Sequence, residues 1–238
     1  MSSIATSDRI ALDALAEPKQ MSPDELDPAQ WVARFESIYA EAGGDIGRIP
    51  WAHAQPCPLM VSWMNSEAPA LIRCGARVAV VGCGLGTDAV ELRERGYDVV
   101  AFDACPSAVH WAKQRFPDHA ESFVHADLLD LPARLRNRFD LVVEVHTLQA
   151  LPPCHRRALA LGMASMLSPR GGLLLVVSRG RDASIPLHTL EGPPFPLTQA
   201  ELVQLMEGSG LGAIARIDEF MDDCSPPVRR LRGCFRRV

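Results

Sequence analysis

The stretch VAVVGCGLGTDAVELRERGYDVVAFD, residues 78–103, decides the fold. Val78–Val81 form a short apolar run of the kind that a strand buried on both faces requires. A glycine-rich turn follows, and then residues 88–95 carry helix-forming side chains. A second apolar run, residues 99–102, ends on Asp103. Strand, glycine turn, helix, strand and acid in this order predict one nucleotide-binding half of a doubly wound sheet.

The three glycines of the turn and the acid after the second strand indicate what this half would bind. Gly82, Gly84 and Gly86 carry no Cβ, so the backbone can turn sharply and a ligand can lie against the main chain. Asp103 comes nineteen positions after Gly84, where the second strand ends. A carboxylate there can accept hydrogen bonds from both hydroxyls of a ribose. The sequence therefore predicts a nucleoside against the turn.

The spacing of the glycines separates two classes of ligand. A dinucleotide fold needs a third small residue at the sixth position of its motif, but here Thr87 stands there and Gly86 comes one residue early. The resulting G-x-G-x-G resembles motif I of the class I S-adenosylmethionine (SAM)-dependent methyltransferases, whose cofactor has no pyrophosphate. The resemblance runs from about residue 75 to the C-terminus, less specifically after residue 150. It implies a Rossmann-like, doubly wound α/β sheet of seven strands with an antiparallel last strand.

This resemblance also implies where the cofactor SAM, and its product S-adenosylhomocysteine, would lie. An acid after the third strand, Asp127, resembles the residue that receives the adenine amine in these enzymes, although an aspartate at a strand end also serves as a cap or turn residue. We expect the cofactor to contact the glycine turn, the ends of the second and third strands and an acid near the end of the fourth: Gly82, Cys83, Gly84, Gly86, Asp103, Ala104, Asp127, Leu128 and Glu144. For Glu144 strand alternation leaves open whether it reaches the cofactor or points into the sheet.

The segment before the sheet has no evident role in a doubly wound core. We therefore expect residues 1–70 to form an N-terminal helical lid packed on a methyltransferase core of residues 71–238, as one structural domain. Capping patterns begin at Ser22 and at Asp27-Pro28, and the helix that follows carries Trp31 and Tyr39 on one face. This front end is loosely similar to that of the thiopurine methyltransferase group. Trp51, in a loop, would either stack over the sulfonium, also lining the substrate site, or plug the lid onto the core.

Substrate residues are expected where the fourth and fifth strands end. His146 follows the fourth strand, residues 139–145, and is a candidate base or a residue that shapes the pocket. Arg179 ends the fifth strand and would hold a substrate carboxylate or form a salt bridge in its loop. The histidines and cysteines show no metal-ligand spacing, so no metal is predicted.

Composition limits the class of protein further. With 238 residues, 47% of them hydrophobic, the chain can bury one full core. A formal net charge of −5 disfavours nucleic acid as a partner. Seven cysteines without paired spacing, and no apolar run long enough for a membrane, favour a cytoplasmic protein. We expect a monomer or a homodimer, with a small-molecule methyl acceptor as its partner. Near the C-terminus residues 213–220 and 231–238 predict a hairpin, and the arginines at positions 229–237 are interpreted as the charged margin of an edge strand.

These observations predict a SAM-dependent methyltransferase that acts on a small molecule by positioning the two reactants. Sulfur is slightly preferred over nitrogen or oxygen as the acceptor. This preference rests on the loose similarity of the front end to the thiopurine methyltransferase group and on the lack of an evident base, since a thiol with pKa near 8.5 ionises readily. The alternatives are an NAD-dependent oxidoreductase and a catalytically silent, SAM-binding partner subunit.

Overall fold

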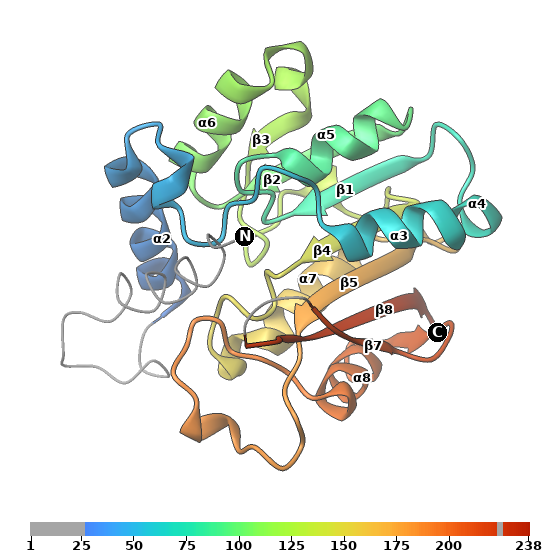
Figure 1. The fold of residues 1–238 in the computed structure, drawn as a ribbon. Coiled ribbons are helices and arrows are strands. Elements are labelled where there is room, and N and C mark those ends of the chain that lie inside the picture. The colour runs from blue at the N-terminus through green and yellow to red at the C-terminus, as the bar shows by residue number, and fades with distance from the viewer. Residues whose placement is uncertain (1–26, 223–225) are drawn as a thin grey trace.

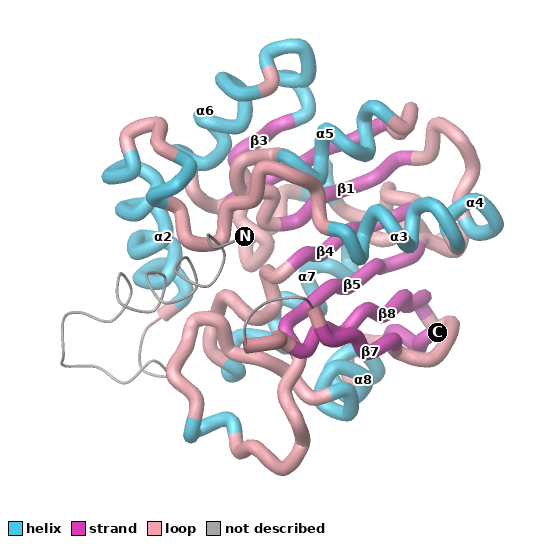
Figure 2. Tube along the Cα trace, in the orientation of Figure 1, coloured by secondary structure: helices cyan, strands magenta, loops and turns pink. Residues whose placement is uncertain are grey.

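The computed structural model describes residues 27–222 and 226–238. Its centre is one eight-stranded sheet of order β3-β2-β1-β4-β5-β8-β6, with β7 also paired to β8 (Figures 1 and 2). The five strands from β1 to β5 pair in parallel, and β8 runs antiparallel to each of its neighbours. The strands are β1 (Arg77–Val81), β2 (Asp98–Asp103), β3 (Phe123–His125), β4 (Leu141–Val145), β5 (Leu173–Arg179), β6 (Leu211–Ala213), β7 (Asp218–Met221) and β8 (Arg229–Arg237).

Helices cover both faces of this sheet, as the predicted doubly wound fold requires (Figure 1). One face packs against α3 (Pro58–Ser66), α4 (Ala68–Leu71), α5 (Thr87–Glu94) and α6 (Pro106–Arg115), and the other against α7 (Arg156–Met166) and α8 (Gln199–Glu207). Strand alternation divides the core accordingly: Val78 and Val80 face α3 and α5, whereas Ala79 and Val81 face α7. Short 3-10 helices occupy Ile46–Arg48, Pro117–Ser122, Ala133–Leu135, Pro153–His155 and Leu187–Thr189.

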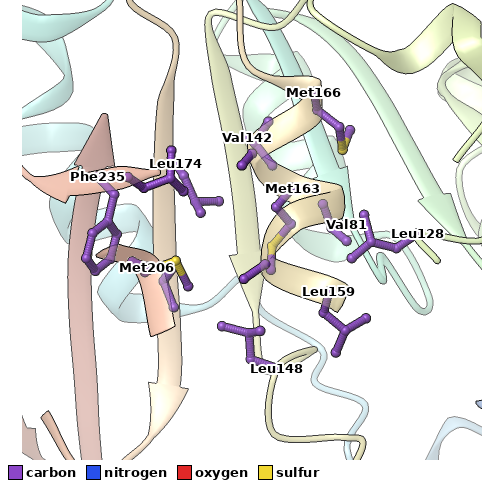
Figure 3. Close-up of a cluster of buried hydrophobic side chains, with 14 of the residues drawn as sticks. Val81, Leu128, Val142, Leu148, Leu159, Met163, Met166, Leu174, Met206 and Phe235 are labelled. Atoms are coloured by element: carbon purple, nitrogen blue, oxygen red, sulfur yellow. The ribbon is translucent and has the colours of Figure 1, made fainter. Parts of the chain in front are cut away.

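The side of the core around α7 is densely packed with large apolar side chains. Figure 3 shows Met163 of α7 beside Val142 and Val81 of the central strands, with Leu159 further along the same helix. Every one of these four side chains is at most 2% exposed. Apolar strands buried on both faces are what the continuous hydrophobic runs of the sequence predict.

The segment before the sheet begins with α2 (Pro28–Ala42), the expected helix. The side chain of Asp27 accepts a hydrogen bond from the backbone N–H of Gln30 at 2.9 Å, and Gln30 returns a bond to Asp27, so the predicted cap at Asp27-Pro28 is confirmed. The helix ends at Gly43 in the left-handed conformation, φ 59°. The capping pattern that begins at Ser22 lies outside the described residues, as does the rest of the lid before residue 27.

The C-terminal hairpin forms, with two differences from the expectation. The strand predicted over residues 213–220 is broken into β6 and β7, both of which pair with β8, and this break raises the strand number from seven to eight. The interpretation of the terminal arginines as the margin of an edge strand is wrong, because β8 lies between β5 and its two short partners. Acids of β7 and of the residue after it pair with arginines in the first half of β8: Arg232 donates to Asp218 at 2.7 Å, and Arg230 to Asp222 at 2.9 Å.

Among the residues that the structure describes, no helix combines the length and apolar character needed to cross a membrane.

Candidate active site

The turn after β1 presents bare main chain at the edge of the sheet where the parallel strands end. Gly84 has φ +49°, and a Cβ added there would stand 3.2 Å from the hydroxyl of Tyr39, so a side chain would occupy the space between the turn and α2. Gly86 has φ +86° and packs inward, because its Cβ would come within 2.6 Å of the Phe123 ring. The glycines thus serve two purposes: Gly84 keeps the surface open, and Gly86 lets the turn approach β3.

Asp103 lies beside this turn at the end of β2, where the sequence predicts it. One carboxylate oxygen accepts the backbone N–H of Gly84 and the other that of Cys105, both at 2.9 Å. The side chain is half-buried. Burial raises the pKa of Asp103, and the hydrogen bonds from Cys105 and Gly84 counteract this rise. Each oxygen accepts one backbone N–H, and the Cys105 side chain also bonds to this carboxylate. Acceptor capacity remains for ribose hydroxyls, because a carboxylate has about four lone-pair sites.

The predicted adenine residues follow β3. Asp127 uses one oxygen to accept the backbone N–H of Leu129 at 2.8 Å, so it is a turn residue, and its second oxygen bonds to no described residue. That free oxygen could accept an exocyclic amine. Leu128 is 6% exposed and points into the core beside α7 (Figure 3), so only its main chain is available to a cofactor. The carbonyl of Ala104 lies 3.1 Å from His125 Nε2.

An aromatic cluster from the N-terminal segment covers the turn. The indole N–H of Trp51 donates to the Tyr39 hydroxyl at 2.7 Å, and the two rings meet edge to face with centroids 5.6 Å apart. The Phe35 ring also meets Trp51 edge to face, with ring centroids 5.4 Å apart. Tyr39 is buried and Trp51 half-buried. Sequence reasoning singled out Trp51 but gave Tyr39 no role at the site, and the only signal for it was its place on the apolar face of the helix.

The turn after β4 is organised by Glu144, which points into the core and not toward the cofactor edge. Its side chain is fully buried on the α7 face, and one carboxyl oxygen accepts the backbone N–H groups of Thr147 and Leu148. Burial raises the pKa of Glu144 to about 8, so this acid is mostly protonated at neutral pH. Thr147 then donates its hydroxyl to the carbonyl of Val81 at 3.1 Å, and its side chain fills the space beside Gly82. The ends of β4 and β1 are thereby tied together.

His146 occupies a strained position in this turn. Its φ is +68°, unusual for a residue with a side chain, and its backbone N–H donates to Val177 at 2.9 Å. Its Nδ1 is buried and has no hydrogen-bond partner among the described residues. Burial lowers the pKa of His146 to about 3, helped by the nearby charges of Arg230, His53 and, more weakly, Arg179. A hydrogen bond between its side chain and Gln149 acts in the opposite direction. The imidazole is therefore neutral at physiological pH. Because its pKa is so low, it is a weak base and takes up a proton poorly.

Arg179 ends β5, directly opposite Arg230 of β8. Its side chain is half-buried, and its guanidinium forms no hydrogen bond or ion pair to any described residue. The predicted salt bridge in the loop is therefore not formed within the described part of the chain.

The thiol of Cys83 lies inside the glycine turn. Burial and the charge of Asp103 raise the pKa of this thiol, so it stays protonated. Within the described residues no group of side chains is arranged to hold a metal ion.

The strand order reverses between β1 and β4, and ligands of open α/β sheets bind at such a switch point, outside the carboxyl ends of the strands. The bare turn, Asp103 and Asp127 all lie at this edge, and their free acceptor capacity fits the nucleoside part of SAM. With the antiparallel β8, this arrangement defines a class I SAM-dependent methyltransferase.

Comparison with known proteins gives the family. The family model of thiopurine S-methyltransferase (TPMT) matches residues 29–233, and the chain belongs to this family. It is 26% identical over 197 residues to thiocyanate methyltransferase 1 of Brassica oleracea, covering 79% of this chain and 82% of that protein. It is 25% identical to a probable thiol methyltransferase 2 of Arabidopsis thaliana, with 75% of each chain covered.

A solved structure supports the fold. The 1,6-didemethyltoxoflavin-N1-methyltransferase of Burkholderia thailandensis, solved with bound S-adenosylhomocysteine, superposes with a TM-score of 0.66 at 18% identity, covering 94% of this chain and 93% of the other. The protein is accordingly a SAM-dependent methyltransferase of small molecules, and the alternative of an NAD-dependent oxidoreductase is set aside.

Proposed function

We propose that this enzyme transfers the methyl group of SAM to the sulfur of a small-molecule thiol. The observation that carries the proposal is the state of His146, the predicted base: it is neutral, and burial and neighbouring cations disfavour its protonated form. An alcohol or phenol usually needs a base to lose its proton, whereas a thiol with pKa near 8.5 ionises readily. The names of the thiol and thiocyanate methyltransferases to which the chain is similar support the same choice.

In this proposal the chain's own residues bind and orient the reactants. Asp103 accepts the ribose hydroxyls, Asp127 receives the adenine amine, and the turn around Gly84 lies against the nucleoside. Trp51, above the turn, faces the sulfonium and contributes about 0.5–2 kcal/mol if the contact is a cation–π interaction. His146 shapes the acceptor side, past the end of β4. Cys83, Ala104 and the main chain of Leu128 complete the cofactor site.

When bound, SAM supplies an electrophilic methyl group on a sulfonium. The electron pair of the acceptor thiolate forms the new bond to the methyl carbon, and the electrons of the breaking carbon–sulfur bond stay on the departing sulfur, giving a thioether and S-adenosylhomocysteine. The thiol proton goes to solvent before the transfer. Catalysis then consists mainly of alignment and exclusion of water, which the lid can provide.

We propose that the segment up to residue 70 acts as this lid. Four contacts of its described part support the role. Glu36 accepts both the N–H and the hydroxyl of Ser107 at the start of α6. Trp51 meets Tyr39 over the turn, Thr87 donates to the carbonyl of His53 at 3.2 Å, and the N–H of Cys57 donates to Asp88 at 2.7 Å. The last two fasten the lid to the first turn of α5, directly after the glycines.

The acceptor type is tested by incubating the enzyme with SAM and a matched panel of thiophenol, phenol and aniline. Production of S-adenosylhomocysteine and of each methylated product is followed by mass spectrometry. We expect thiophenol to be methylated fastest, and His146→Ala to retain SAM binding and most of kcat while changing mainly KM. His53, the exposed imidazole of the lid, is replaced by alanine in parallel.

Faster turnover of phenol or aniline, or a collapse of kcat in either histidine variant, contradicts a base-free sulfur transfer. Binding of SAM without transfer to any acceptor supports the alternative of a catalytically silent partner subunit.

We further propose that the enzyme works in the cytoplasm as a monomer or homodimer, without a membrane or nucleic acid as a partner. The net charge of −5 supports the last point, since a nucleic-acid binder needs a basic surface. Light scattering coupled to size exclusion would determine the oligomeric state.

A further inference from the structure

The acceptor side of the site carries a positive charge that no residue in the described part of the chain neutralises. Arg179 and Arg230 stand directly opposite each other in the antiparallel pair of β5 and β8. Side chains at opposite positions share one face of the sheet, and like charges so placed are destabilising. Alternation along β5 puts Arg179 on the same face as Leu173 and Leu175, which pack toward α3.

Within the part of the chain that the structure describes, only one of the two charges is compensated. Arg230 donates to the carboxylate of Asp222 at 2.9 Å through both Nε and Nη2. The neighbouring acids are engaged as well, since Asp182 and Glu219 both pair with Arg229. The backbone N–H of Arg179 is held by Gln149, yet its half-buried guanidinium has no partner among the described residues. A half-buried cation beside a second arginine, with no partner among the described residues, is suited to bind an anionic group of a ligand.

The position of Arg179 relates this charge to the methyl acceptor. His146 leaves β4 beside Val177, to which its N–H is bonded. Arg179 is two residues further along β5, which places its Cα about 6–7 Å beyond that point. The charges of both arginines also act on the pKa of His146, so all three side chains are within electrostatic range of one another. Arg179 therefore lies past the predicted reaction centre, where the distal end of an acceptor would be.

We propose that Arg179 binds a carboxylate of the methyl acceptor, so that the preferred substrate is a small thiol with a carboxylate a few bonds from its sulfur. This inference rests on the proposed sulfur transfer and specifies its substrate class. The planar guanidinium matches a carboxylate in a bidentate, charge-assisted pair. Arg230, whose charge Asp222 balances, occupies the position across the strand where an acid could otherwise pair with Arg179.

The test compares two acceptors that differ only in charge, 3-mercaptopropionate and its methyl ester. We expect the wild-type enzyme to favour the acid at least about 10-fold in kcat/KM. Arg179→Met should lower kcat/KM for the acid about 10- to 100-fold, mainly through KM, and leave the ester within about 3-fold. Arg179→Lys, which keeps the charge but loses the fork, should fall between. Arg170→Met, an exposed arginine of the loop before β5, is the matched control.

A binding measurement provides a readout independent of turnover. Calorimetry with 3-(methylthio)propionate in the presence of S-adenosylhomocysteine should show the same 10- to 100-fold loss in Arg179→Met, with affinity for S-adenosylhomocysteine alone unchanged. Equal use of acid and ester by the wild type, or equal losses for both in Arg179→Met, overturns the carboxylate assignment and leaves sulfur transfer standing. If neither thiol is methylated although SAM binds, the proposed function fails, and this inference with it.

Discussion

Replacing Asp103 by alanine should damage both the fold of the glycine turn and the binding of SAM. The carboxylate holds two backbone N–H groups, of Gly84 and Cys105, through charge-assisted bonds of 2.9 Å. Because the side chain is half-buried, water can replace part of what is lost, and we expect the free energy of unfolding to fall by about 2–4 kcal/mol in total. The loss of the ribose hydrogen bonds, worth about 1.5–3 kcal/mol, should weaken SAM roughly 10- to 100-fold.

Chemical denaturation and titration calorimetry measure these two effects separately. Asp103→Asn keeps one acceptor oxygen and should give about half of each loss. Asp98→Ala is the control on the same strand. Asp98 lies at the other end of β2, is 63% exposed, and its carboxylate comes only within 3.8 Å of the Arg77 guanidinium. We expect the free energy of unfolding to change by no more than about 0.5 kcal/mol and the SAM affinity to stay the same. A folded Asp103→Ala variant that binds SAM as tightly as the wild type would refute the placement of the cofactor.

Three further predictions concern the turn, the core acid and the lid. Gly86→Ala should lower the free energy of unfolding by about 2–4 kcal/mol, because the added Cβ would come within 2.6 Å of the Phe123 ring. The control is Gly96→Ala, where φ is +85° but no atom of the described residues lies near the added Cβ. It should lower the free energy of unfolding by only about 1 kcal/mol in the same denaturation assay. Because the pKa of Glu144 is raised in the folded state, its contribution to stability is full below the unfolded pKa near 4.5 and is lost as pH rises through about 8. Between these values the free energy of unfolding should fall by about 1.4 kcal/mol per pH unit. Glu144→Gln should remove this slope from denaturation measurements, and an unchanged slope would mean that the acid is ionised in the folded protein. Trp51→Phe should leave the protein folded and lower its affinity for SAM by less than about 10-fold in calorimetry. A loss of stability without a change in SAM affinity would mean that the indole only packs the lid onto the core.

The fold and the cofactor edge could be predicted from the sequence because their signals are local. The apolar run, the spacing of the glycines and the acid at Asp103 all lie within 26 residues, and strand alternation and backbone freedom fix what they form. The cap at Asp27-Pro28 is equally local, since it depends on atoms three residues apart. For such features the neighbouring sequence contains nearly all of the relevant contacts.

The acceptor side could not be predicted in the same way, because its character comes from pairs that are distant in the chain. The charge on Arg179 matters only since Arg230, 51 positions later, lies opposite it and is already neutralised by Asp222. The edge-strand interpretation of the arginines failed for the same reason: composition shows a basic end, but only the pairing of β8 shows that β7 supplies its acids. Tyr39 likewise gains a role only when α2 is docked over the glycine turn.

The turn after β4 shows how a residue in the core can set the geometry of the reaction. Period-two alternation left the direction of Glu144 open, and the structure turns it inward, where its carboxyl group holds the N–H groups of Thr147 and Leu148. These hydrogen bonds are made within a sharp turn in which His146 adopts φ +68°. In the same turn the Thr147 hydroxyl donates to the carbonyl of Val81, the residue before Gly82. A neutral buried acid thus fixes the distance between the acceptor side and the cofactor side. Changes at Glu144 should therefore alter turnover although its side chain touches neither reactant, since misplacement by about 1 Å can cost 100-fold in rate.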